Sequence, residues 1–187
     1  MTVAGQRLST RQRLEAAAVR MFAEAGFDRV RVVDIAHAAG VTERTFFRHF
    51  GSKEDVLLAN HTPMLALLCE RISAPVDGTL EERVCSALDA IASTTARDPL
   101  AVVRARLLLT TASLRERSFT LQSEWEAAIV EVATSLGETR LEARVLAAAS
   151  IAAFRIAIEE WADDVTRSDL QPLTTRALRR LFPAVYE

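Results

Sequence analysis

The chain has 187 residues, of which 50% are hydrophobic, and its formal net charge is −2. It contains no uninterrupted apolar run of about 18 residues, and its first residues lack the apolar core of a signal peptide. These features argue against a membrane protein and a secreted one, so we expect a soluble, cytoplasmic protein. The two cysteines, Cys69 and Cys85, each lie in an apolar helical pattern, which favours buried free thiols over a disulfide.

The charge is distributed unevenly along the chain. Residues 1–53 carry nine Lys or Arg and five Asp or Glu, a net charge of +4, whereas residues 54–187 carry a net charge of −6. A basic N-terminal part on an acidic remainder is typical of a protein that presents one end to phosphates.

Helix-start signals recur along the whole chain. Capping-box patterns, in which Ser or Thr is followed three residues later by an acid or amide, begin at Ser9, Ser52, Thr79, Ser113 and Thr139. Asp98-Pro99 adds a start signal with proline at the first helical position. Six glycines and five prolines leave little room for strand turns. We therefore predict an all-α protein of about nine helices. The Ser52 helix should kink or split at Pro63.

Residues 32–50 have the pattern of two short helices joined by a sharp turn. Gly40 can end the first helix in the left-handed conformation, and Thr42 can cap the second through its hydroxyl. Phe46 and Phe50 recur at helical spacing on the inner face. The outward face is left with hydrogen-bond donors, namely Thr42, Arg44, Thr45, Arg48 and His49. A recognition helix for DNA needs such a face, although an ordinary helical hairpin with a hydrated polar face has the same pattern.

Residues 9–58 resemble the DNA-binding domain of the TetR family of transcriptional regulators. The resemblance rests on Ala25-Gly26-Phe27, Asp34-Ile35-Ala36, Ala39-Gly40-Val41, Thr45 to Phe50, and Ser52-Lys53-Glu54. It implies an N-terminal three-helix helix-turn-helix head, residues 1–53, and a helical ligand-binding and dimerisation body, residues 54–187. The expected DNA contacts are Arg31, Thr42, Arg44, Thr45, Phe47, Arg48, His49 and Lys53. Among them, Arg44 and Thr45 are expected to face bases, whereas Thr42, His49 and Lys53 are expected to hold phosphates.

Two positions depart from the family pattern. Phe47 stands where the family usually has Tyr, which removes a hydroxyl that commonly contacts phosphate. Arg31 stands where a Thr often opens the second helix, which removes a cap but adds a cation.

The body is similar, more loosely, to the C-terminal domain of the mycofactocin-associated regulators and their relatives, and this resemblance implies an acyl-CoA-like effector. The candidate pocket residues are His61, Met64, Arg104, Phe119, Trp125 and Phe154. Arg104 either faces solvent, pairs with an acid or meets an anionic ligand, because an arginine is rarely buried without a partner. Taken singly, each aromatic residue is better explained as part of the core than as part of a pocket.

The segment from Arg140 to Asp163 has two apolar stripes, and one suffices to pack on the chain's own body. The other stripe, with the terminal helix, predicts a four-helix interface between two copies. The expected interface residues are Val145, Ala148, Ala152, Ile156, Leu173, Ala177 and Leu181. The alternative is a monomer in which the terminal helix covers the second stripe.

Enzyme signatures are missing from the sequence: it has no Gly-x-Ser-x-Gly elbow, no glycine-rich phosphate loop and no His-Glu-x-x-His. His37, His49 and His61 have no metal-ligand spacing, so we expect no metal and no cofactor. The expected function is a homodimeric repressor, released from a palindromic double-stranded DNA operator by an unknown small-molecule effector. The alternative is an all-α small-molecule-binding protein or enzyme whose helical hairpin does not bind DNA.

Overall fold

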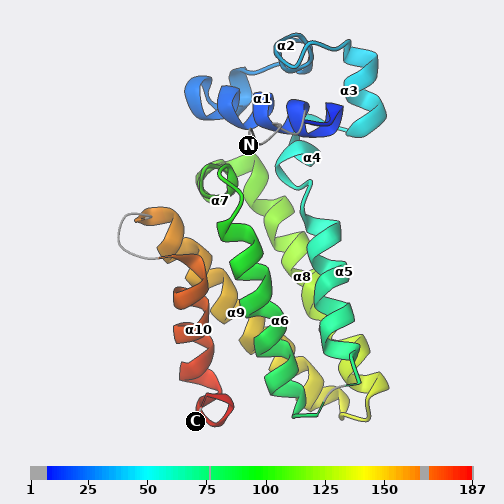
Figure 1. The fold of residues 1–187 in the computed structure, drawn as a ribbon, viewed down its shortest axis with the longest axis vertical. Helices are drawn as coiled ribbons and strands as arrows, with labels where there is room; N and C mark the ends of the chain where they lie inside the picture. The colour runs from blue at the N-terminus through cyan, green and yellow to red at the C-terminus, as the bar shows by residue number, and fades with distance from the viewer. Residues whose placement is uncertain (1–7, 76, 165–168, 187) are drawn as a thin grey trace, which may run out of the picture. The chain divides into compact units, whose positions relative to one another are not determined.

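The computed structural model describes residues 8–75, 77–164 and 169–186, and within these ranges every regular element is a helix. They comprise ten α-helices and two short 3₁₀-helices, which confirms the all-α prediction with one helix more than expected (Figure 1). The chain divides into two compact units, residues 1–59 and 60–187, here called the head and the body. None of the described helices is long and apolar enough to cross a membrane.

The head contains α1 (Thr10–Ala25), the 3₁₀-helix η1 (Phe27–Arg29), α2 (Val32–Ala38), α3 (Glu43–His49) and α4 (Lys53–Leu57). Its core is built from side chains that α1, α2, α3 and α4 each bury completely, including Leu14, Phe22, Ile35, Phe46 and Val56. Because α4 packs against α1, the head extends to Ala59 rather than ending at residue 53.

The body contains α5 (His61–Ser73), α6 (Leu80–Ala96), α7 (Ala101–Thr110), α8 (Ala112–Ser135), α9 (Arg140–Asp163), α10 (Leu170–Leu181) and the 3₁₀-helix η2 (Pro183–Val185). Neighbouring helices pack as α5 with α6 and α8, α8 with α9, and α10 with α6 and α9 (Figure 1). A single apolar core joins them, with Leu68, Leu88, Ile91, Ile129 and Leu170 fully buried.

Both cysteines are free, as predicted, but only one of them is fully buried. Cys69 on α5 is half-buried, and Cys85 on α6 is buried. Burial raises the pKa of the Cys85 thiol to about 11, so it remains protonated at neutral pH.

Most of the helix starts are confirmed. Ser9, Thr79 and Thr139 each form a complete capping box, and the Ser52 hydroxyl accepts from the Asp55 amide. The start predicted at Ser113 is wrong, because α8 begins one residue earlier, at Ala112, and Thr111 precedes it without a side-chain cap. Thr111 adopts an extended conformation between α7 and α8, so a single residue separates the two helices.

The Ser52 helix is interrupted, but before Pro63 rather than at it. α4 ends at Leu57 and α5 begins at His61, so Pro63 is the third residue of α5. The first turn of a helix has amide groups without intrahelical acceptors, and a proline there removes no hydrogen bond. The extra helix in the count comes from this interruption.

Candidate nucleic-acid interface

The turn between α2 and α3 has the predicted geometry. Gly40 adopts a left-handed conformation with φ of 67°, which a side chain would disfavour. The Val41 amide donates to the Ala36 carbonyl at 2.9 Å, and the Ala39 amide donates to the Ile35 carbonyl at 3.0 Å. The carbonyls of Ile35 and Ala36, in the last turn of α2, are thereby satisfied, and the chain reverses within a few residues.

Helix α3 is fixed at its start by a cap and along one face by aromatic packing. The Thr42 hydroxyl accepts from the Thr45 amide at 3.2 Å. Phe46 and Phe50 are buried, with ring centres 5.5 Å apart. A seven-residue helix is not stable alone, so its orientation depends on this packing.

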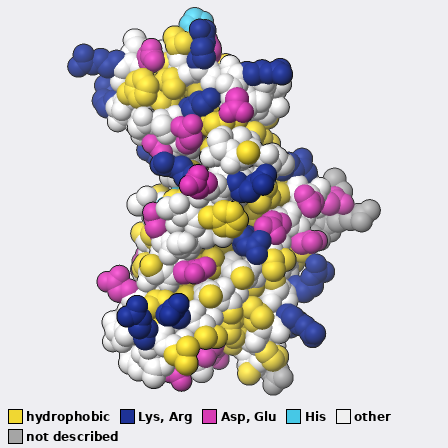
Figure 2. Space-filling view, turned by 180° about the vertical axis from the view of Figure 1, so that it is seen from behind, with side chains coloured by type: hydrophobic (Ala, Val, Ile, Leu, Met, Phe, Trp, Pro, Cys, Tyr) yellow, Lys and Arg dark blue, Asp and Glu magenta, His cyan; other side chains and the backbone are white. Residues whose placement is uncertain are grey.

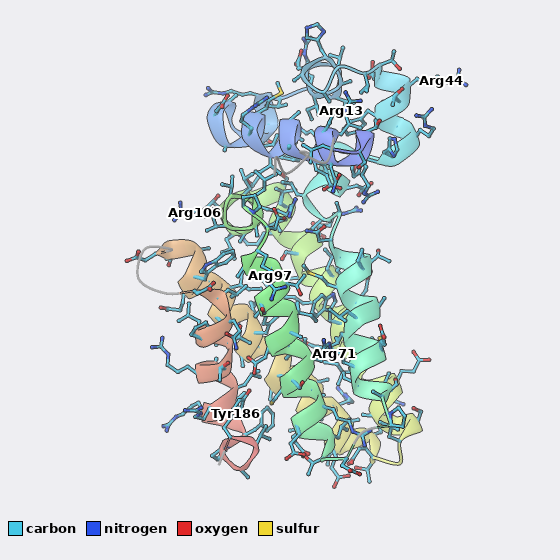
Figure 3. All side chains as sticks on the ribbon, viewed as in Figure 1. Arg13, Arg44, Arg71, Arg97, Arg106 and Tyr186 are labelled. Atoms are coloured by element: carbon cyan, nitrogen blue, oxygen red, sulfur yellow. The ribbon has the colours of Figure 1, made fainter. Side chains whose placement is uncertain are left out.

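The opposite face of α3 carries exposed cations and an exposed aromatic ring. Arg44 and Arg48 are exposed, and Phe47 retains 51% of its accessible surface. Figure 3 shows Arg44 pointing away from α3 into solvent. Thr45 is half-buried, and its hydroxyl lies 3.0 Å from that of Thr42. Arginine, hydroxyl and aromatic groups on one face of a capped helix are suited to reading base edges and holding phosphates.

Lys53, which we expected to hold phosphate, has its ammonium group engaged inside the head. Its Nζ donates to the Phe27 carbonyl at 2.9 Å and to the Val30 carbonyl at 3.3 Å. The same atom lies 4.3 Å from the centre of the Phe27 ring. The ammonium group therefore joins the start of α4 to the segment between α1 and α2.

Arg31 and His49 are also less free than the sequence indicates. The Arg31 guanidinium donates twice to the Asp34 carboxylate, each time at 2.9 Å, and these hydrogen bonds lower the pKa of Asp34. The side chain of Arg31 stays exposed, so it can exchange this partner for a phosphate. The His49 ring is half-buried, and its Nε2 atom is shielded from solvent.

Three of the predicted pocket residues form an aromatic layer in the body. The ring centres of His61 on α5 and Trp125 on α8 lie 6.0 Å apart. Trp125 in turn stacks on Phe154 of α9, with ring centres 6.1 Å apart. His61 Nε2 is 3.6 Å from a carboxylate oxygen of Glu124. Met64 lies one turn further along α5, and its sulfur accepts from the Thr95 hydroxyl at 3.8 Å. Residues far apart in the sequence are thus brought together across three helices.

The other two candidates lie elsewhere. Phe119 is 57% exposed on α8 and does not line an interior site. Arg104 is buried and donates to the Asp98 carboxylate at 2.7 Å, so the interpretation of an ion-paired arginine is confirmed. Among the residues that the structure describes, no cluster of His, Cys, Asp and Glu could hold a metal ion.

The predicted interface residues divide between surface and core. Val145 and Ile156 on α9 and Leu181 on α10 are large apolar side chains left exposed, and Ala148 on α9 is exposed as well. Ala152 and Ala177 are half-buried. Leu173 is only 6% exposed because it packs into the chain's own core, so its assignment to an interface needs correction. In Figure 2, hydrophobic side chains gather on the surface of the body.

Arg11, which was missed in the sequence, is a further polar residue that organises the head. Its guanidinium contacts Glu15, the His49 carbonyl and the Ala59 carbonyl. An arginine at the second position of a helix gives no local signal of partners 38 and 48 residues away.

Family models match both units. Residues 14–59 match the model of bacterial regulatory proteins of the tetR family, and residues 79–185, more than half of the chain, match the MftR C-terminal domain. The chain belongs to the TetR family. Its head is therefore the family's helix-turn-helix domain, with α3 in the place of the recognition helix.

Individual relatives agree with this membership. MftR of Mycobacterium tuberculosis, named as a transcriptional regulator of mycofactocin biosynthesis, is 29% identical over 69% of this chain and 66% of its own length. TcmR of Streptomyces glaucescens, a helix-turn-helix transcriptional regulator, is 45% identical over 31% of this chain and 24% of its own length. The matched regions thus span less than two thirds of either relative.

A solved structure is similar over nearly the whole chain. Thermus thermophilus FadR, described as a TetR-family transcriptional repressor in complex with lauroyl-CoA, aligns with a TM-score of 0.61 at 25% identity. The alignment covers 92% of this chain and 93% of FadR. It extends through both units, so the TetR-type fold is not limited to the head.

Proposed function

We propose that this TetR-family protein is a ligand-responsive DNA-binding transcriptional regulator that works as a repressor. The observation that carries the proposal is the face of α3, on which Arg44, Phe47 and Arg48 are exposed while Phe46 and Phe50 anchor the helix from behind. In this arrangement α3 enters the major groove, Arg44 and Thr45 read base edges, and Thr42, Arg48 and Arg31 hold the backbone. We also infer a cytoplasmic location, because the family model that matches the head describes bacterial regulators, whose DNA lies in the cytoplasm.

The test is a selection of bound sequences from random double-stranded DNA, followed by titrations of the selected site and of scrambled DNA at several salt concentrations. We expect a palindromic site bound about 10³-fold or more tightly than scrambled DNA. We also expect affinity for both to fall steeply with salt, because bound phosphates release counterions. Equal affinity for both DNAs at every salt concentration would contradict the proposal.

We infer that the body binds an effector with a long apolar part. The aromatic layer of His61, Trp125 and Phe154 places apolar surface and one polar ring together, and the MftR-type C-terminal domain covers all the helices from α6 onward. The likeness to FadR, which was solved with lauroyl-CoA, supports an acyl-CoA-like effector. Mass spectrometry of small molecules that copurify with the protein, followed by calorimetric titration with lauroyl-CoA, tests this class.

We infer that the protein acts as a homodimer. The exposed face of α9 presents Leu141, Val145, Ala148 and Ile156 to solvent in a single chain. A contiguous apolar stripe of this kind is typical of a surface that a second copy covers. Two heads related by a two-fold axis would span two half-sites, and an effector that favours another head spacing would release the operator.

A further inference from the structure

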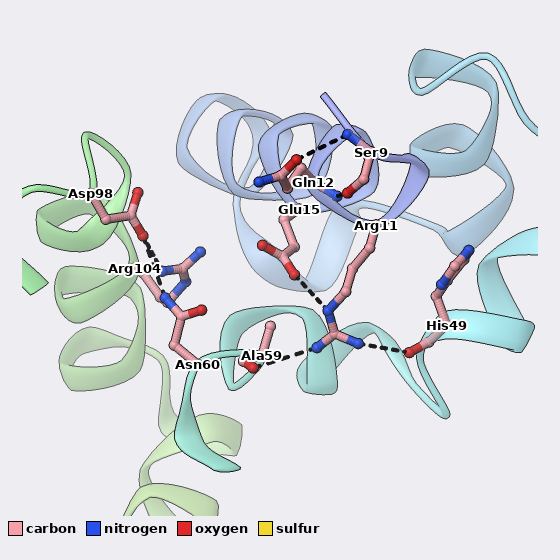
Figure 4. A network of polar contacts seen from close by, with 9 residues as sticks. All are labelled: Ser9, Arg11, Gln12, Glu15, His49, Ala59, Asn60, Asp98 and Arg104. Carbon is pink, nitrogen blue, oxygen red and sulfur yellow. Dashed lines mark hydrogen bonds and ion pairs between the residues drawn. The ribbon is translucent and has the colours of Figure 1, made fainter. Parts of the chain in front are cut away.

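The guanidinium group of Arg11 joins three parts of the head (Figure 4). Its Nε atom pairs with Glu15 at 3.1 Å. Its two terminal nitrogens donate to the His49 carbonyl and to the Ala59 carbonyl, each at 3.4 Å. The group also lies 4.7 Å from the centre of the Phe50 ring. We call these contacts the Arg11 clamp.

The two carbonyls that the Arg11 clamp holds have special positions in the chain. His49 is the last residue of α3, where carbonyl groups have no intrahelical donor and a cation is favourable. Ala59 is the last residue of the head. The planar fork of arginine, which lysine lacks, allows one side chain to hold both at once.

The next residue in the chain is held within the body. The side-chain amide of Asn60 donates to an Asp98 carboxylate oxygen at 3.5 Å (Figure 4). The same carboxylate accepts from the buried Arg104 at 2.7 Å and from the Leu100 amide at 2.9 Å. We call these contacts the Asp98 clamp. It ties the residue that precedes α5 to the beginning of α7.

We propose that Arg11 and Asp98 are positioning residues that couple α7 of the body to the recognition helix α3 through the Ala59–Asn60 junction. The two junction residues are joined by one planar peptide bond, so Asn60 cannot be displaced without moving the Ala59 carbonyl. Arg11 passes that displacement to the His49 carbonyl and hence to the end of α3. This inference rests on the proposed function, since it names the route by which an effector in the body changes DNA binding.

Two substitutions probe the junction from opposite sides. Asn60→Asp replaces the donor to Asp98 with a carboxylate that repels it, and Arg11→Lys keeps the positive charge but removes the fork. Matched controls change the same chemistry on exposed residues outside the clamps, Gln171→Glu on α10 and Arg20→Lys on α1. Thermal unfolding of each full-length variant establishes that it is folded. If Asn60→Asp does not fold, Asn60→Ala is used in its place.

The first measurement is hydrogen exchange at the end of α3, where the Phe50 amide donates to the Phe46 carbonyl at 3.0 Å. It needs neither DNA nor an effector. We expect Asn60→Asp to speed exchange at this amide about threefold or more, although the substitution lies in the body. Arg11→Lys should have a similar effect, and the double variant should exchange no faster than the faster single variant. Both controls should exchange at the wild-type rate.

The second measurement is affinity for the selected operator in the same set of variants. Both clamp variants should lose affinity, and their combined loss should be smaller than the product of the separate losses. Wild-type exchange at α3 in Asn60→Asp, or effects of the two substitutions that simply multiply, would overturn the inference. If the proposed function is wrong, the result differs, because the wild-type chain then selects no operator. The exchange experiment would still test the coupling through the junction, since it needs no DNA.

Discussion

The ammonium group of Lys53 lies 4.3 Å from the centre of the Phe27 ring and donates to the carbonyl of the same residue at 2.9 Å. Phe27 and Val30, whose carbonyls Lys53 satisfies, are both buried, so the segment between α1 and α2 obtains hydrogen bonds from the first residue of α4. A buried carbonyl without a donor is costly, and a cation over an aromatic ring adds a further attraction. The side chain therefore contributes to the structure of the head.

Replacing Lys53 with Met should destabilise the head by about 1–3 kcal/mol, because it leaves the Phe27 and Val30 carbonyls without their donor. Urea unfolding followed by a probe in the head measures this loss. Arg20→Gln, which removes an exposed cation of α1, is the matched control and should have little effect on stability. The opposite outcome is a Lys53→Met variant of unchanged stability that binds all DNA more weakly and with a weaker dependence of affinity on salt. It would show that Lys53 contacts a DNA phosphate instead.

Replacing Arg44 with Ala should cost about 1–3 kcal/mol in binding to the selected operator and should relax its sequence preference at the contacted base. The reason is that Arg44 is exposed near the start of α3 and has no role in the core of the head. Gel-shift titrations with the operator and with single-base variants of it measure both effects. An equal loss on operator and random DNA would show that Arg44 contacts only the backbone.

Replacing Val145 with Glu should dissociate the dimer without unfolding the chain, because Val145 is 61% exposed and lies outside the hydrophobic core of the body. Sedimentation equilibrium at micromolar concentration, with far-ultraviolet circular dichroism as a check on helicity, measures this. Tight binding to a palindromic operator should be lost with it, although no DNA-contacting residue changes. Leu136→Glu, an exposed apolar residue outside the α9 stripe, is the control that should remain dimeric.

Operator DNA should weaken the binding of lauroyl-CoA by the same factor by which lauroyl-CoA weakens operator binding. Linkage requires this equality for any effector that releases the protein from DNA. Calorimetric titration of lauroyl-CoA into the free protein and into the saturated operator complex measures the factor. Identical affinities in the two titrations would show that lauroyl-CoA does not act as a releasing effector.

The Asp89 carboxylate predicts a pH dependence of stability. Burial raises the pKa of Asp89, although hydrogen bonds from Thr175 at 2.8 Å and Tyr186 at 3.2 Å partly oppose the shift. The folded state therefore binds this proton more tightly than the unfolded state does. The resulting stabilisation is complete below the unfolded pKa, about 3.9, and is lost as pH rises through the raised pKa of the folded state.

Asp89→Asn has no such proton to lose. Its free energy of unfolding should therefore improve relative to the wild-type protein as pH increases from about 3 to about 7. Urea unfolding of both proteins across this range measures the difference. A wild-type protein that gains stability over the variant as pH rises would mean that the two hydroxyl donors outweigh burial.

The elements that were predicted correctly depend on interactions within a few residues of the chain. Gly40 turns the backbone because of its own conformational freedom, and Thr42 caps α3 through an amide three residues later. The capping boxes at Ser9, Thr79 and Thr139 have the same short range. Such signals are present in the sequence itself, as are the apolar spacing that makes each helix and the family resemblance of the head.

The partners of charged side chains depended on the tertiary structure. Lys53 was expected to hold phosphate, yet its acceptors lie 26 and 23 residues earlier, and nothing local indicates them. Arg11 reaches a carbonyl 48 residues away, and Leu173 turns into the core rather than toward a second chain. Helical periodicity determines which side chains share a face of a helix. What that face packs against, and which acceptor a long cation reaches, is determined only when distant helices come together.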